Sequence, residues 1–78
     1  MKAMIVGKER KKGTNKAGNP YDNTIVHVTH KMMGVEGLAV ETLFIKASDF
    51  PPDRIIVGKQ CEFDRNSAGY LCAFDMIP

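Results

Sequence analysis

A run of charged and glycine residues, Lys8 to Tyr21, separates two short apolar segments of the chain. Residues 3–6 precede it and residues 25–28 follow it, and both segments have the composition of β-strands. Gly18 can adopt the positive φ that a turn between two strands requires. The pattern predicts two β-strands joined by a basic finger whose far end, being polar, projects into solvent.

Five segments have the alternation and composition of strands: residues 2–12, 21–30, 38–47, 59–65 and 70–77. Gly7 marks a bulge or bend in the first of them. Pro51 and Pro52 interrupt strand structure after the third and leave room only for a short helical turn, with Ser48 as its candidate cap. Five short antiparallel strands predict a single all-β domain, residues 1–78, folded as a closed or nearly closed barrel.

Charge is distributed unevenly along the chain. Residues 1–31 contain seven lysines and arginines against two acids, a net charge of +5, whereas residues 32–78 contain four against seven, a net charge of −3. A basic half beside an acidic one favours a surface that faces a polyanion. The sequence has no apolar run of membrane-spanning length and no signal-peptide pattern, so we expect a cytoplasmic protein without membrane contact.

The basic finger is a candidate site for a single-stranded nucleic acid, which cationic side chains and stacking rings bind together. We expect phosphate contacts from Arg10, Lys12, Lys16 and Lys46, assistance from Lys8 and Lys11, and base stacking by Tyr21. Phe44 shares a strand face with Lys46 and belongs to the core more often than to a stacking platform. Two simpler interpretations stay open: the charges only keep the loop soluble, and Tyr21 packs under the hairpin.

No constellation of catalytic residues is recognisable, so we expect neither enzymatic activity nor a small-molecule substrate. His27 and His30 alternate onto opposite faces of one strand, which excludes joint metal binding and predicts surface or groove positions. Cys61 and Cys72 are too few for a disulfide framework and have no metal-ligand spacing, so buried thiols are expected and no metal or cofactor.

At Gly18-Asn19-Pro20-Tyr21 the chain resembles the filamentous-phage single-stranded-DNA-binding proteins of the gene V type. Members of that family carry Gly-Lys-Pro-Tyr or Gly-Asn-Pro-Tyr at the base of their DNA-binding hairpin. Residues 57–65 and 71–75 are similar, more weakly, to the last hairpin and terminal strand of the same proteins. The resemblance covers nearly the whole strand order, although only about a dozen residues are specific to it.

This resemblance implies an OB-type five-stranded barrel with protruding β-hairpins, and a homodimer formed through the final hairpin. It also implies cooperative, sequence-nonspecific coating of single-stranded DNA during phage or mobile-element replication, in the host cytoplasm. The family's several exposed tyrosines are reduced here to Tyr21 and Tyr70, so Phe44 or Phe63 would supply further stacking. Phe63 and Tyr70 are alternatively dimer contacts or core residues.

Two other functions are consistent with the same residues. An RNA-binding OB module uses the same kind of groove, and only RNA presents a 2′-hydroxyl group to it. A protein-interaction or assembly subunit would carry the basic loop for solubility alone and would bind no nucleic acid.

Overall fold

The structure is a computed structural model that describes all 78 residues, Met1 to Pro78. Five antiparallel strands form one sheet with the order β3-β2-β1-β4-β5. The elements are β1 (Lys2–Thr14), β2 (Pro20–His30), β3 (Ala39–Lys46), the 3₁₀ turn η1 (Pro52–Arg54), β4 (Gln60–Arg65) and β5 (Leu71–Met76). The predicted all-β class and the five strands are confirmed, with β1 extending two residues beyond its expected end.

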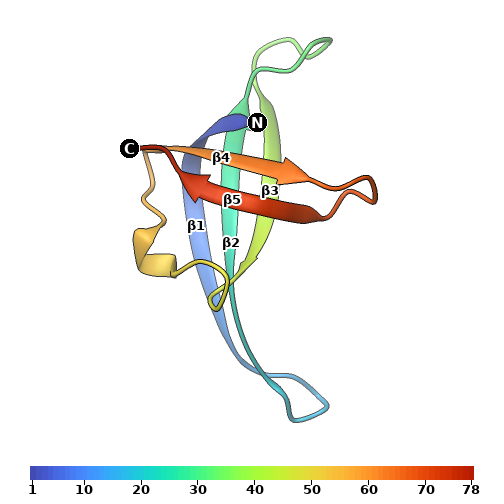
Figure 1. The fold of residues 1–78 in the computed structure, drawn as a ribbon, viewed down its shortest axis with the longest axis vertical. Helices are drawn as coiled ribbons and strands as arrows, with labels where there is room; N and C mark the ends of the chain where they lie inside the picture. Colours follow the sequence, from blue (N-terminus) through green and yellow to red (C-terminus); the bar gives the residue numbers. More distant parts are fainter.

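The sheet folds into two layers (Figure 1). Strands β1, β2 and β3 run side by side along the long axis, and β4 and β5 cross them. Strand β1 belongs to both layers, because it pairs with β2 along most of its length and with β4 through Lys2, Ala3 and Met4. The two end strands, β3 and β5, share no hydrogen-bonded ladder, so the sheet is open between them.

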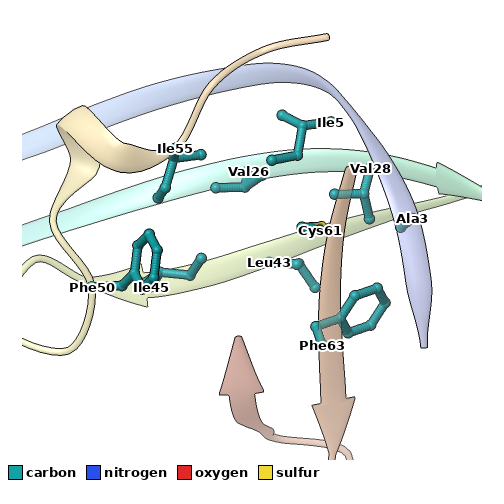
Figure 2. Packing of buried hydrophobic residues seen from close by; sticks show 10 residues of the cluster. All are labelled: Ala3, Ile5, Val26, Val28, Leu43, Ile45, Phe50, Ile55, Cys61 and Phe63. Atoms are coloured by element: carbon teal, nitrogen blue, oxygen red, sulfur yellow. The ribbon is translucent and has the colours of Figure 1, made fainter. Parts of the chain in front are cut away.

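The core lies between the layers (Figure 2). Ten buried residues form it: Ala3, Ile5, Val26, Val28, Leu43, Ile45, Phe50, Ile55, Cys61 and Phe63. We call the face of β1–β3 that covers this core the inner face and the opposite one the outer face. Cys61 is buried as predicted, but Cys72 is exposed, because Leu71, Phe74 and Met76 are the β5 residues that pack against the core.

A β-bulge in β1 decides which side chains reach each face. The register with β2 shifts between Ile5 and Gly7, which leaves Val6 as the additional residue, and a bulge near Gly7 is thereby confirmed. Ile5 faces the core before the bulge, and Lys8 lies on that same face after it, opposite Val26. Without the extra residue, every side chain beyond it would project from the other face.

The short helical turn predicted between β3 and β4 is present as η1, but Ser48 does not cap it. The turn begins after Pro51 and has no side-chain cap hydrogen bond. Pro52 occupies the start of the turn, where a missing N–H leaves nothing unsatisfied, so no cap is needed at that position. No helix in the structure has the length and apolar character that crossing a bilayer demands.

Candidate nucleic-acid interface

One row of side chains crosses three strands on the outer face. Lys11 of β1 pairs with Asn23 of β2, and Asn23 pairs on its other side with Lys46 of β3. Directly paired residues of antiparallel strands project from the same face. Two lysines therefore flank an asparagine on a single rung of the sheet, and neither lysine takes part in an ion pair.

Tyr21 lies two residues from Asn23 towards the hairpin tip, opposite Gly13. Its ring packs over this glycine: a Cβ built on Gly13 would lie 3.0 Å from Oη and 3.2 Å from Cζ of Tyr21. The side chain is nevertheless 41% exposed. Hollows of about 480 Å³ and 370 Å³ are both lined by Tyr21, the first together with Lys12 and the second together with Lys46. Tyr21 thus packs against the hairpin and also presents its ring to solvent.

Phe44 lies two residues from Lys46, on the other side of the row from Tyr21, and is paired with Ile25. Its side chain is 68% exposed, so the expectation that it belongs to the core is wrong. The reason is the alternation of β3, whose neighbouring residues Leu43 and Ile45 fill the core instead. An exposed ring beside the Lys11–Asn23–Lys46 row is the geometry that a stacking platform requires.

Lys8 and Arg10, on the inner face, have partners within the chain. Lys8 Nζ donates to the carbonyl oxygens of Pro52 (2.9 Å) and Ile55 (2.6 Å), which attaches η1 to β1. Arg10 donates to both carboxylate oxygens of Asp22, with Nε at 3.0 Å and Nη2 at 2.7 Å. This hydrogen bonding raises the pKa of Arg10 and lowers that of Asp22.

Lys12 and Lys16 extend the basic surface towards the tip of the β1–β2 hairpin. Lys12 pairs with Asp22 across the ladder and forms no ion pair. Lys16 is exposed in the turn, which Asn15 organises by accepting hydrogen bonds at Oδ1 from the backbone N–H groups of Ala17 and Asn19.

The structure therefore divides the eight residues predicted for the site among three places. The outer face carries Lys11, Tyr21, Phe44 and Lys46. The inner face carries Lys8, Arg10 and Lys12, and the hairpin tip carries Lys16. Asn23 was missed, although its alternation with Tyr21 on one strand already placed both on the same face.

The two residues considered for a dimer contact also differ. Phe63 is 1% exposed and belongs to the core, so its side chain is unavailable to a partner or a base. Tyr70 is 72% exposed beside the turn between β4 and β5. Of the pair, only Tyr70 can meet another molecule without unfolding of the core.

A polar cluster on the inner face was not anticipated. His30 is buried, contrary to the expectation of a surface or groove position, and its Nε2 is hydrogen-bonded to Glu41. Arg65 of β4 donates from Nε to the same carboxylate at 3.1 Å. Residues far apart in the sequence form this cluster, so no local sequence pattern could have predicted it.

No protein-family model matches the chain, and comparison with curated proteins and with solved structures gives no match either.

Proposed function

We propose that this protein binds single-stranded DNA with little sequence preference through the outer face of β1–β3. The observation that carries the proposal is the Lys11–Asn23–Lys46 row, placed between the exposed rings of Tyr21 and Phe44. Each ring lies two residues along its strand from a member of that row, a separation of about 7 Å. Cations and rings thereby alternate across one face.

The physical basis is electrostatic attraction combined with stacking. Lys11 and Lys46 hold phosphates, with Lys12 and Lys16 adding positive charge along the hairpin. Every phosphate neutralised on a single strand contributes about −0.7 to the slope of log K against log salt concentration. Stacking of a base on Tyr21 or Phe44 contributes about 1–3 kcal/mol and is indifferent to sequence. Asn23 can donate to or accept from a base between the two lysines.

The proposal extends to architecture and assembly. The crossing of β4–β5 over β1–β3 is interpreted as an OB-type barrel left open between β3 and β5, with the β1–β2 hairpin protruding as in phage proteins of the gene V type. The exposed Tyr70 beside the last turn supports a homodimer formed through β4–β5. Analytical ultracentrifugation of wild type and Tyr70→Ser tests it, and a wild-type monomer at high concentration contradicts it.

Fluorescence anisotropy with labelled oligo(dT) at several salt concentrations tests the DNA site. Lys11→Gln and Lys46→Gln are each expected to weaken binding and to reduce the salt slope by about 0.7. Lys59→Gln is the matched control, since it removes one exposed cation outside the site and leaves that slope in place. An affinity that does not change with salt concentration, or the absence of binding, overturns the proposal and favours the protein-interaction function.

Competition with an RNA oligomer of matched sequence separates DNA from RNA as the preferred ligand. Only RNA presents a 2′-hydroxyl group, so a strong preference for the RNA competitor would move the proposal to an RNA-binding module.

A further inference from the structure

The gap between β3 and β5 contains a groove of about 640 Å³. Aromatic side chains of Phe44, Phe50 and Phe74 line it, and Ser48 and Asp49 supply its polar groups. Mostly apolar walls with a few polar groups, at volumes of about 300–1,000 Å³, are typical of small-ligand sites. Seven of the nine lining residues are hydrophobic, but the surface that they expose in the groove is more polar than apolar. The open side of the sheet therefore has the size of a binding site for a flat group with polar edges.

The groove is built from ordered contacts. Phe50 and Phe74 meet edge to face, with ring centroids 5.1 Å apart and an interplanar angle of 84°. The turn after β3 is closed by hydrogen bonds from the N–H groups of Asp49 and Phe50 to the carbonyl oxygen of Lys46, at 2.9 Å and 3.1 Å. That turn holds the polar residues of the groove directly after the lysine of the outer-face row.

The groove is continuous with the proposed DNA site. Ser48 lines both the groove and the hollow between Tyr21 and Lys46. Phe44 belongs to the outer face and also to the groove wall. A strand held by Lys46 can therefore direct a neighbouring base into the groove without leaving the surface.

We propose that this groove is a base subsite that favours bases with an exocyclic amino group, and that Asp49 determines the preference. The inference rests on the proposed DNA-binding function and adds a sequence preference at one position. An ionised carboxylate only accepts hydrogen bonds. Cytosine presents an N4 amino donor, whereas thymine presents the acceptor O4 at the corresponding position. A carboxylate thus attracts the first base and repels the second.

Oligo(dC) and oligo(dT) of equal length test the subsite, because the two pyrimidines are close in size. Anisotropy is measured at mildly alkaline pH and fixed salt with wild type, Asp49→Asn and Asp53→Asn. Wild type should bind oligo(dC) about threefold to tenfold more tightly, the effect of one net hydrogen bond. Asp49→Asn should abolish most of this ratio, since an amide can also donate a hydrogen bond, which O4 of thymine accepts.

Asp53→Asn is the control, because it makes the same charge change on an exposed residue of η1 outside the groove, and it should keep the wild-type ratio. Thermal unfolding verifies that both variants are folded. Equal affinity of wild type for the two oligomers, or a ratio that survives in Asp49→Asn, overturns the subsite and leaves the DNA-binding function intact. Failure of wild type to bind either oligomer overturns both.

Discussion

The ring of Tyr21 lies over Gly13, so close that a methyl group added to the glycine would be 3.0 Å from Oη of Tyr21. The φ angle of Gly13 is not positive, so the backbone itself accepts any side chain at this position. What the glycine supplies is space for the ring. The register of β2 places Tyr21 on the outer face, and the absence of a side chain at Gly13 allows its ring to lie over the ladder.

Substitution of Gly13 should move the Tyr21 ring in proportion to the size of the new side chain. Alanine requires a shift of a few tenths of an ångström, whereas valine, which suits a strand, requires a larger displacement. We expect Gly13→Val to change the Tyr21 ring-proton shifts and to weaken oligo(dT) binding more than Gly13→Ala does. Unchanged ring shifts in the valine variant would contradict the packing of Tyr21 on Gly13.

Replacement of Lys8 should affect stability, whereas replacement of Lys11 should affect DNA binding. Methionine suits both tests, because it keeps most of the side chain and removes the charge. Lys8→Met removes the donor of the Ile55 carbonyl oxygen, whereas the Pro52 carbonyl oxygen still accepts from the backbone N–H of Ile55. The substitution should lower the free energy of unfolding by about 1 kcal/mol. Lys11→Met should leave stability unchanged and weaken oligo(dT) binding. Urea titration and anisotropy measure the two effects, and a binding loss in folded Lys8→Met equal to that of Lys11→Met would assign Lys8 to the DNA site.

The ion pair of Arg10 with Asp22 predicts a contribution to acid stability. Hydrogen bonding to Arg10 lowers the pKa of Asp22 in the folded state, so the unfolded chain takes up the proton first. The stabilisation is present above the ordinary aspartate pKa, about 4, and is lost as pH falls through the lower folded pKa. Asp22→Asn should flatten the acid limb of stability against pH, and salt should reduce the difference because the pair is exposed.

Glu36→Gln serves as the control for that titration, because Glu36 lies in the loop between β2 and β3 and forms no ion pair. Its acid limb should match that of wild type. Identical acid limbs for Asp22→Asn and wild type would show that the Arg10–Asp22 pair contributes nothing to stability in solution.

Much of the sheet was predictable from local alternation. Strands β2 and β3 lie within two residues of their predicted bounds, because the periodicity of two is strong where one face is buried. The bulge was also predictable locally, because a glycine inside a strand pattern, here Gly7, often marks one. A closed or nearly closed barrel was expected from five short antiparallel strands in one small domain, and neither feature decides whether β3 and β5 pair.

The site was less predictable because it depends on contacts distant in sequence. The sequence of a run of lysines does not indicate which of them form hydrogen bonds within the chain. Lys8 donates to the carbonyl oxygens of Pro52 and Ile55 only because η1 folds back beside β1. For Phe44 the alternation of the strand left core and stacking platform both open, and the burial of Leu43 and Ile45 places it on the exposed face. Long-range packing, which one strand's pattern does not contain, decided both outcomes.

The cluster of His30, Glu41 and Arg65 should stabilise the packing of the two layers, since it connects β2 and β3 of one layer with β4 of the other. The side chain of His30 is 4% exposed, and both of its ring nitrogens lie near acceptors, Glu41 Oε2 and the carbonyl oxygen of Lys31. Glu41→Ala removes the partner of a buried histidine and should cost about 1–3 kcal/mol. Glu9→Ala, at an exposed position, is the control in the same urea titration, and an equal loss in both variants would contradict a structural role for the cluster.

Thr24 offers a route to a more stable protein. Its side chain is fully buried on the inner face of β2, and its Oγ1 has no hydrogen-bond partner. A buried hydroxyl without a partner costs free energy, and valine keeps the β-branched shape without the polar atom. We expect Thr24→Val to raise the free energy of unfolding by about 1 kcal/mol. Thr29→Val, on the half-exposed outer face, should change it little, because Thr29 Oγ1 can reach water. Destabilisation by Thr24→Val would instead indicate that a buried water satisfies the hydroxyl.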